Sequence, residues 1–249
     1  MLLVDIGNSR VKWARLERGM LGMQRAAAYA GWTATDWRTQ LFDAGPVDAV
    51  LAATVAGGAS AAALREAAHV ATGLEPRFVT TAREAAGVRN GYADPALLGV
   101  DRWLAVIGAY HRVRGACVVA DIGTAATIDV VAADGQHGGG FIVPGPALML
   151  ASLVSGTSDL GARHESSGPA SGARFADNTR DAMERGCRLA VAALIDRSVQ
   201  EACGAHGPPA LLLTGGAAAE VQPHLHSRGE CVPDLVLRGL AALAGVEPV

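Results

Sequence analysis

Two short stretches of the sequence carry residue types that can hold a metal ion and a phosphate group. Asp5-Ile6-Gly7-Asn8-Ser9 lies near the start and Asp121-Ile122-Gly123-Thr124-Ala125 near the middle, and each follows a short apolar run. The aspartate of such a turn can hold Mg²⁺ and its waters. The glycine lets a ligand approach the backbone closely, and the neighbouring hydroxyl and amide groups add donors for phosphate. Two such turns half a chain apart indicate a duplicated domain that binds a nucleotide.

A third carboxylate, Asp101, precedes Arg102 at the beginning of an amphipathic helix expected over residues 100–114. Two interpretations of this pair remain open. In the first, Asp101 stabilises the helix dipole and Arg102 is a surface residue. In the second, the helix N-terminus and the neighbouring arginine keep Asp101 ionised, so that it can accept a proton from a hydroxyl group.

Three further features limit the reactions and ligands that this sequence can support. Lys12 is the only lysine of the chain, which removes the P-loop motif GxxxxGK[ST] and nearly all Schiff-base chemistry. The glycine-rich segment 138–145 either packs closely at a strand-to-helix crossover or contacts a ligand. The seven histidines show no spacing typical of metal ligands.

Composition excludes several classes of protein. Half of the residues are hydrophobic, the net charge is −3 and the pI is about 6.2, so a nucleic-acid partner is not expected. The four cysteines form no C-x-x-C pair and suit reduced thiols, most of them in the core. With no apolar run long enough for a signal peptide or a membrane span, we expect a cytoplasmic protein that does not contact the membrane.

The expected elements follow the order βββαβαβ in the first half, which is the order of the ribonuclease-H-like half-domain shared by actin, Hsp70 and sugar kinases. We therefore expect an α/β protein of two tandem ribonuclease-H-like domains, residues 1–114 and 115–249, with a nucleotide cleft between them. The expected strands of the first half cover residues 1–6, 10–17, 20–30, 47–53 and 75–79, with helices after Thr33 and over 60–71. The second half should contain strands 116–121 and 210–216, helices 146–154, 178–205 and 234–244, and a mobile loop over 156–173.

With these pieces in order, the sequence resembles the type III pantothenate kinases of the acetate and sugar kinase/Hsp70/actin superfamily, a family also labelled Bvg accessory factor. The motifs that carry the resemblance span nearly the whole chain in the family's order. They are Asp5-Ile6-Gly7-Asn8-Ser9, Gly99-Val100-Asp101-Arg102, Asp121-Ile122-Gly123-Thr124-Ala125, Gly139-Gly140-Phe141-Ile142-Val143-Pro144-Gly145, Asn178-Thr179 with Ala182 and Gly186, and Thr214-Gly215-Gly216.

The resemblance implies a role for each matching residue. The residues that would contact ATP are Asp5, Ile6, Gly7, Asn8, Ser9, Arg10, Val11, Lys12 and Thr124, with Asp5 also near Mg²⁺. The residues that would line the pantothenate pocket are Tyr92, Gly99, Val100, Asp101, Arg102 and Thr179, with Asp101 the proton acceptor. Asp121 matches the aspartate that binds a monovalent cation, K⁺ or NH₄⁺. Ser9 replaces a common threonine, and Lys12 replaces a common apolar residue, so that a solvated strand edge remains an equal alternative for Lys12.

The implied reaction is transfer of the γ-phosphate of ATP to the primary hydroxyl of pantothenate, the first step of coenzyme A synthesis. The family is a homodimer in which the pantothenate site is completed across the subunit interface. Three alternatives stay open at this point: a kinase of the same superfamily with another hydroxyl acceptor, a non-catalytic ATP-binding regulator, and a chaperone-like ATPase. The chain offers no helix-turn-helix with a basic face and no peptide-binding domain in support of the last two.

Overall fold

The computed structural model describes residues 1–157, 175–204 and 207–245, and within them two compact units. Unit 1 contains residues 1–115, 131–138 and 234–249, and unit 2 contains residues 116–130 and 139–233. The closing helix and the segment 131–138 thus group with unit 1, so the units are not two contiguous halves, and the expected boundary after residue 114 stays a prediction. The loop expected over 156–173 lies outside the described residues, apart from its first two.

Unit 1 is built on a sheet of the order β3-β2-β1-β5-β6, with β4 also paired to β2. The central strand β1 (Leu2–Ile6) runs antiparallel to β2 (Arg10–Glu17) and parallel to β5 (Val50–Thr54). The remaining strands are β3 (Met20–Leu21), β4 (Arg25–Ala28) and β6 (Arg77–Phe78), and β7 (Glu84–Ala85) with β8 (Val88–Arg89) forms a separate two-stranded sheet. The single strand expected over 20–30 is instead two strands, β3 and β4, which both pair with β2: Leu21 lies opposite Leu16 and Arg25 opposite Trp13.

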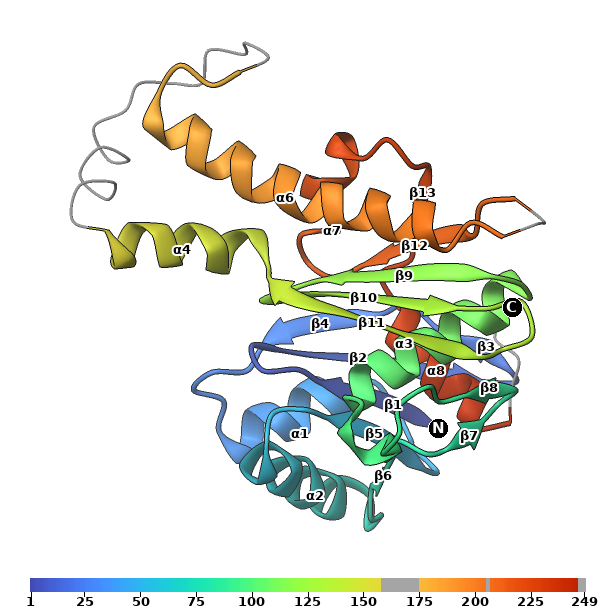
Figure 1. Cartoon of the computed structure of the whole chain (residues 1–249). Helices are drawn as coiled ribbons and strands as arrows, with labels where there is room; N and C mark the ends of the chain where they lie inside the picture. Colours follow the sequence, from blue (N-terminus) through green and yellow to red (C-terminus); the bar gives the residue numbers. More distant parts are fainter. Residues whose placement is uncertain (158–174, 205–206, 246–249) are drawn as a thin grey trace. The chain divides into compact units, whose positions relative to one another are not determined.

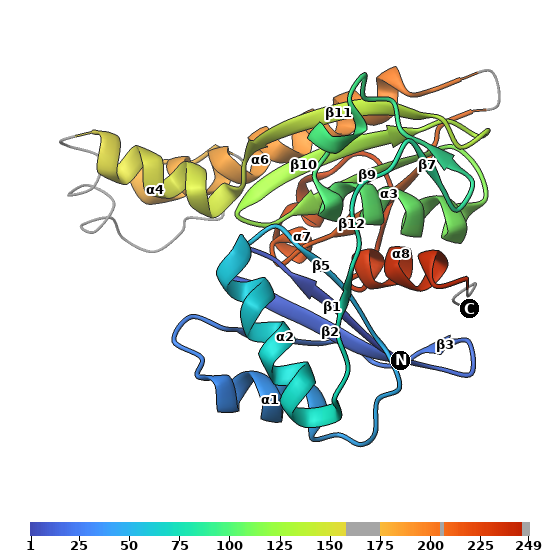
Figure 2. The same cartoon turned by 90° about the horizontal axis from the view of Figure 1, so that it is seen from below.

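Two helices of unit 1, α1 (Ala34–Phe42) and α2 (Gly58–Thr72), lie side by side against the sheet (Figures 1 and 2). The apolar side chains between these helices and the strands form one buried cluster that includes Ile6 and Val11. The local sequence sets the helix limits: Thr33 and Asp36 make a reciprocal capping box at the start of α1, and α2 ends at Gly73 in the left-handed conformation.

The helices α3 (Val100–Val113) and α8 (Leu235–Leu243) pack closely on one another, and α8 also contacts β1. Glycine makes this close approach possible. A Cβ atom on Gly108 would lie 2.3 Å from the Leu235 carbonyl oxygen, and one on Gly239 would lie 2.0 Å from the Leu104 carbonyl oxygen. A short 3₁₀ helix, η1 (Pro95–Leu97), leads the chain into α3.

Unit 2 repeats the strand order of unit 1 as β11-β10-β9-β12-β13. The hairpin strands β9 (Cys117–Ile122) and β10 (Ala125–Val131) correspond to β1 and β2, and β12 (Ala210–Thr214) runs parallel to β9 as β5 does to β1. β11 (His137–Pro144) and β13 (Gly229–Cys231) are the edge strands. The common strand order supports the duplication inferred from the repeated acidic turn.

The helices of unit 2 are α4 (Pro146–Gly156), α6 (Thr179–Glu201), α7 (Ala218–Val221) and the 3₁₀ helix η2 (Gln222–His224). Asn178 caps α6 by accepting a hydrogen bond from the Asp181 N–H at 3.0 Å. α4 and the first turns of α6 extend away from the sheet of this unit (Figure 1). Among the described residues, no helix has both the length and the apolar character needed to cross a lipid bilayer.

The cysteines divide evenly between the interior and the surface. Cys117 and Cys187 are buried, whereas Cys203 and Cys231 are exposed. Burial raises the pKa of the Cys117 thiol to about 12, so this residue is an inert part of the core. The expectation that most cysteines are in the core is therefore wrong, because two of the four are exposed.

Candidate active site

The first acidic turn connects β1 to β2 in unit 1. Asp5 is only 7% exposed, whereas Asn8, Ser9 and Arg10 are exposed. The Gly7 N–H closes the turn by donating to the Arg10 carbonyl at 2.9 Å. The turn therefore combines a buried carboxylate with several polar groups that a ligand can reach.

The strand register next to this turn fixes the position of Lys12. Lys12 lies directly opposite Asp5 in the antiparallel pair, and β2 carries β4 on its other side. Lys12 is therefore inside the sheet and its side chain is half-buried, so the interpretation as a solvated strand edge is wrong. Ile6 and Val11 belong to the buried core of unit 1, which leaves them only backbone atoms for any contact with a nucleotide.

The second acidic turn connects β9 to β10 in unit 2 and is one residue shorter than the first. The Gly123 N–H donates to the Ala125 carbonyl at 2.9 Å, two residues later, whereas Gly7 donates to Arg10, three residues later. Gly145 lies against this turn: its N–H donates to the Thr124 carbonyl at 2.8 Å, and a Cβ atom on it would lie 2.1 Å from the Gly123 carbonyl oxygen. The glycine-rich segment thus serves close packing at this position, while the Thr124 side chain remains exposed.

The glycine turn that follows β12 lies next to Asp121. Thr214 pairs with Asp121 in the parallel register, and Gly215 adopts a φ of +92°. A Cβ atom on Gly215 would lie 2.5 Å from Asp121 Oδ1 and 2.4 Å from the Ile122 carbonyl oxygen. Two motifs that are distant in the sequence therefore meet within one unit, with two oxygen atoms side by side.

Asp101 lies in the first turn of α3, after the N-cap residue Gly99. Its Oδ1 atom accepts the N–H of Arg102 at 2.8 Å. A Cβ atom on Gly99 would lie 2.7 Å from the same oxygen, so the carboxylate occupies space that only glycine leaves open. The half-exposed carboxylate remains accessible to a small molecule.

Arg102 is 5% exposed and contacts Tyr92, so the interpretation of Arg102 as a surface residue is wrong. Its Nη1 donates to the Tyr92 hydroxyl at 2.8 Å, and its guanidinium carbon lies 5.7 Å from the centre of the Tyr92 ring. Unit 1 therefore brings Tyr92, Gly99, Asp101 and Arg102 into one group, with Val100 as the first residue of α3 between them.

Three residues around Tyr92 were missed by the sequence analysis. The Asn90 Oδ1 accepts the Tyr92 N–H at 2.9 Å, Arg83 donates to the Tyr92 carbonyl at 2.9 Å, and the His137 ring stacks on the Tyr92 ring. The pair Asn90-Gly91 directly before Tyr92 is typical of a turn and could have drawn attention to Asn90, but no spacing in the sequence connects residue 137 to residue 92.

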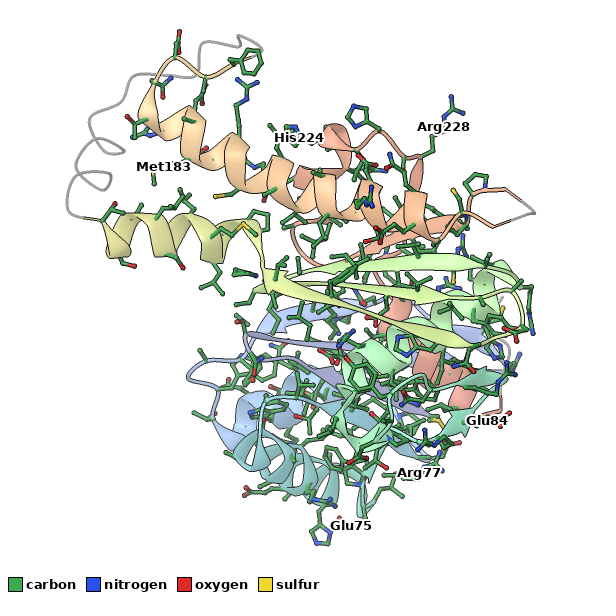
Figure 3. All side chains as sticks on the ribbon, in the orientation of Figure 1. Glu75, Arg77, Glu84, Met183, His224 and Arg228 are labelled. Atoms are coloured by element: carbon green, nitrogen blue, oxygen red, sulfur yellow. The ribbon has the colours of Figure 1, made fainter. Side chains whose placement is uncertain are left out.

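Thr179, the first residue of α6, lies in unit 2 on a cavity of about 900 Å³ between α4 and α6. Met183 projects from α6 into the space beside α4 (Figure 3). Most lining side chains are apolar, and Asn178 and Thr179 add polar groups at one end. The predicted nucleotide and metal ligands also come from both units. Asp5 to Lys12 belong to unit 1, and Asp121 and Thr124 belong to unit 2.

Comparison with known proteins identifies the family. Residues 1–201 match the sequence model of a family described as type III pantothenate kinase. This chain belongs to the type III pantothenate kinase family. A type III pantothenate kinase from Nitrosococcus oceani is 37% identical over 261 residues, which cover 98% of this chain and 93% of the relative. One from Azoarcus sp. is 39% identical over 248 residues, which cover 99% of this chain and 91% of the relative.

The family inferred from the motifs is therefore confirmed, and with it the class of enzyme, an ATP-dependent pantothenate kinase. Among solved structures, a putative Baf family transcriptional activator from Campylobacter jejuni has a TM-score of 0.60 at 21% identity and covers 98% of both chains. An activator of the 2-hydroxyisocaproyl-CoA dehydratase from Clostridium difficile, with bound ADPNP, has a TM-score of 0.55 at 12% identity and covers 99% of this chain and 94% of the other. At such identities the likeness shows only the fold, and it confirms the predicted actin-like ATPase class.

Proposed function

We propose that this enzyme transfers the γ-phosphate of ATP to the primary hydroxyl of pantothenate, with Asp101 as the general base. The observation that carries the proposal is the group formed by Asp101, Arg102 and Tyr92 at the N-terminus of α3 in a chain of this family. In that group an accessible carboxylate lies next to a buried cation and an aromatic hydroxyl. These are the groups needed to bind a small polar acid and to deprotonate its alcohol.

In the proposed reaction, the hydroxyl oxygen of pantothenate forms a bond to the γ-phosphorus. The bond from that phosphorus to the β–γ bridging oxygen breaks, ADP leaves, and the hydroxyl proton passes to Asp101. An alcohol is a weak nucleophile, so a carboxylate within hydrogen-bonding distance assists as the new bond forms. Alignment and compensation of charge supply most of the acceleration in phosphoryl transfer.

For the nucleotide, we propose the two acidic turns as the binding elements. In the first turn, Asn8, Ser9 and Arg10 are exposed polar groups beside a glycine backbone, and Lys12 contributes a cation on the neighbouring strand. In the second, Thr124 offers an exposed hydroxyl. Backbone and hydroxyl donors of this kind hold phosphate oxygens, and a cation nearby offsets their charge.

The residues of the first turn fit a magnesium ion. Asp5 supplies a hard oxygen ligand next to the proposed phosphate donors, and Mg²⁺ is commonly held by one or two carboxylates together with substrate phosphates. When bound, the ion would neutralise charge that develops on the phosphates. The task of the chain is to hold the Asp5 carboxylate at the end of β1, where burial and the sheet fix its position.

The residues around Asp121 fit a monovalent cation, K⁺ or NH₄⁺. Asp121 Oδ1 and the Ile122 carbonyl oxygen both lie against Gly215, so two oxygen ligands point to the same place. A side chain at position 215 would collide with both oxygens, because a Cβ atom there would lie 2.5 Å from Asp121 Oδ1 and 2.4 Å from the Ile122 carbonyl oxygen.

We also propose that the enzyme is a homodimer and that its partner subunit completes the pantothenate site. The support is that α4 leaves apolar side chains exposed on more than one side, namely Leu148, Leu153 and Val154. A surface of this kind on a helix that extends from the sheet is typical of a protein–protein contact. Thr179 lies on the adjoining cavity, which would connect the interface to the substrate. Neither nucleic acid nor a membrane is proposed as a partner, and the cytoplasmic location stays a prediction.

A coupled assay of ADP release with pantothenate tests the function, run with K⁺, NH₄⁺ or Na⁺. We expect phosphopantothenate to form, with higher activity in K⁺ or NH₄⁺ than in Na⁺. Asp101→Asn should lower kcat by about 10²–10⁴ while ATP binding stays nearly unchanged, because the variant lacks only the proton acceptor. Wild-type turnover by this variant would exclude Asp101 as the base, and turnover of sugars or acetate in place of pantothenate would favour another kinase of the superfamily.

A further inference from the structure

The Tyr92 ring has two neighbouring side chains, Arg102 and His137, that come from distant parts of the sequence. Arg102 contacts it through the hydroxyl group, at 2.8 Å, and lies over its face. The His137 ring lies parallel to it, with a ring-centre distance of 6.1 Å and an angle of 14° between the planes. Both neighbours are almost completely buried, Arg102 at 5% and His137 at 1% exposure, so neither can move away from the ring without repacking unit 1.

His137 belongs to a segment that is firmly attached to β8. The N–H of Arg89 donates to the Gly135 carbonyl at 2.9 Å, and the Arg89 side chain donates to Gln136 Oε1 at 3.2 Å and to Asp134 Oδ2 at 2.7 Å. Gly135 packs so closely that a Cβ atom on it would lie 2.2 Å from the Gly87 carbonyl oxygen. The His137 backbone therefore has a fixed position relative to the backbone that precedes Tyr92, and burial of the side chain (1% exposed) leaves its ring little room to turn.

The Tyr92 backbone is also held in place by a hydrogen bond, from its own N–H to the Asn90 side chain. Asn90, which is buried, accepts the Tyr92 N–H, and its Nδ2 donates to the Ala82 carbonyl at 3.3 Å. The backbone thus fixes where the Tyr92 side chain begins, but it leaves the torsions of the side chain free. The stacked His137 ring is what restricts the plane of the Tyr92 ring, and through the hydroxyl it restricts Arg102.

We propose that His137 is a positioning residue for the acceptor substrate, because it fixes the plane of the Tyr92 ring and thereby the Arg102 guanidinium next to Asp101. The proposal rests on the proposed function, since it assumes that Tyr92, Asp101 and Arg102 line the pantothenate pocket. This role requires a flat ring at position 137, because the His137 ring lies parallel to the Tyr92 ring. Because His137 stacks on Tyr92 of the proposed pantothenate pocket, a change at position 137 should affect the acceptor substrate much more than ATP.

The test compares His137→Leu with His137→Phe. Leucine removes the flat ring, and we expect the KM for pantothenate to rise about tenfold while the KM for ATP stays within about twofold. Phenylalanine keeps a flat ring of similar size and should restore the KM for pantothenate to near the wild-type value. His69→Leu is the matched control, because it makes the same substitution at an exposed position of α2 and should change neither constant.

A double-mutant cycle with Tyr92→Leu shows whether His137 acts through Tyr92. In that background, His137→Leu should raise the KM for pantothenate no further, whereas general damage to the fold would add a second loss. The inference is overturned if His137→Leu leaves the KM for pantothenate unchanged, if the phenylalanine variant is as impaired as the leucine variant, or if the two losses add. If the wild-type enzyme does not phosphorylate pantothenate, the proposed function is wrong. If the wild-type enzyme is active and the variants give one of the results just named, only the role of His137 is wrong.

Discussion

At the scale of single residues, the most consequential contact is the one between Gly99 and the Asp101 carboxylate. Gly99→Ala would place a methyl group only 2.7 Å from Asp101 Oδ1, which is too close for either atom to stay where it is. The carboxylate is the end of a short side chain and can rotate away, so stability should change little. A displaced base is poorly aligned, and we expect kcat for pantothenate to fall by about 10–10² with the urea midpoint of unfolding unchanged.

The double variant Gly99→Ala, Asp101→Asn tests whether Gly99→Ala lowers kcat by displacing the Asp101 carboxylate. If Gly99→Ala acts only by moving the carboxylate, it should cause no additional loss of kcat in the Asp101→Asn background. A further loss there would mean that Gly99 contributes in another way, for example by direct contact of its backbone with the substrate.

Asp196 illustrates a residue that matters for stability instead of catalysis. Burial alone would raise the pKa of Asp196, but the N–H groups of His226 and Ser227 donate to its carboxylate at 2.9 and 2.8 Å and hold that pKa below its ordinary value. A lowered pKa in the folded state means that the stabilisation is complete above about pH 4 and is lost as the pH falls further.

The corresponding variant is Asp196→Ala. It should lower the free energy of unfolding at pH 7 by about 1–2 kcal/mol, because two partly buried N–H groups lose a charged acceptor. The difference from wild type should shrink as the pH is lowered from 5 to 3, which urea unfolding across that range would measure. If the difference in unfolding free energy between the two proteins does not change with pH, the ionised form of Asp196 is not what stabilises the segment at His226 and Ser227.

At the scale of elements, the close contact between α3 and α8 depends on two glycines. Gly108→Ala would bring a methyl group to 2.3 Å from the Leu235 carbonyl oxygen, so the two helices must move apart. We expect a loss of at least about 2 kcal/mol in the free energy of unfolding, as for other overpacked cores. Gly58→Ala is the control, since nothing lies within 4 Å of that position, and it should stay within about 0.5 kcal/mol of wild type by urea unfolding.

Most elements could be predicted from the sequence because local chemistry determines them. The capping box at Thr33, the left-handed Gly73 and the cap at Asn178 are short-range signals, and each marks the helix end that the structure has. The two acidic turns were recognisable because both copies kept the same residue types. What the sequence could not show are contacts between distant segments, such as His137 on Tyr92 or Gly215 on Asp121, since no local pattern connects these positions.

At the scale of the whole molecule, the exposed apolar surface of α4 leads to a prediction about assembly. Leu153 is 37% exposed on this helix and also lines the cavity that contains Thr179. If two copies of the chain meet there, a charge at position 153 would be buried without a partner, which costs enough to prevent association at micromolar concentration. Leu153→Asp should therefore be a folded monomer, whereas Val70→Asp, which changes an exposed apolar residue of α2, should stay a dimer.

Sedimentation measures the assembly of both variants, and the kinase assay shows whether assembly matters for the reaction. Because the partner is proposed to complete the pantothenate site, the Leu153→Asp monomer should lose pantothenate phosphorylation at least about tenfold more than the Val70→Asp control. ATP binding depends on residues within one chain in this proposal, so it should persist in the monomer. A wild-type protein that sediments as a monomer, or a fully active Leu153→Asp monomer, would show that each chain carries a complete acceptor site by itself.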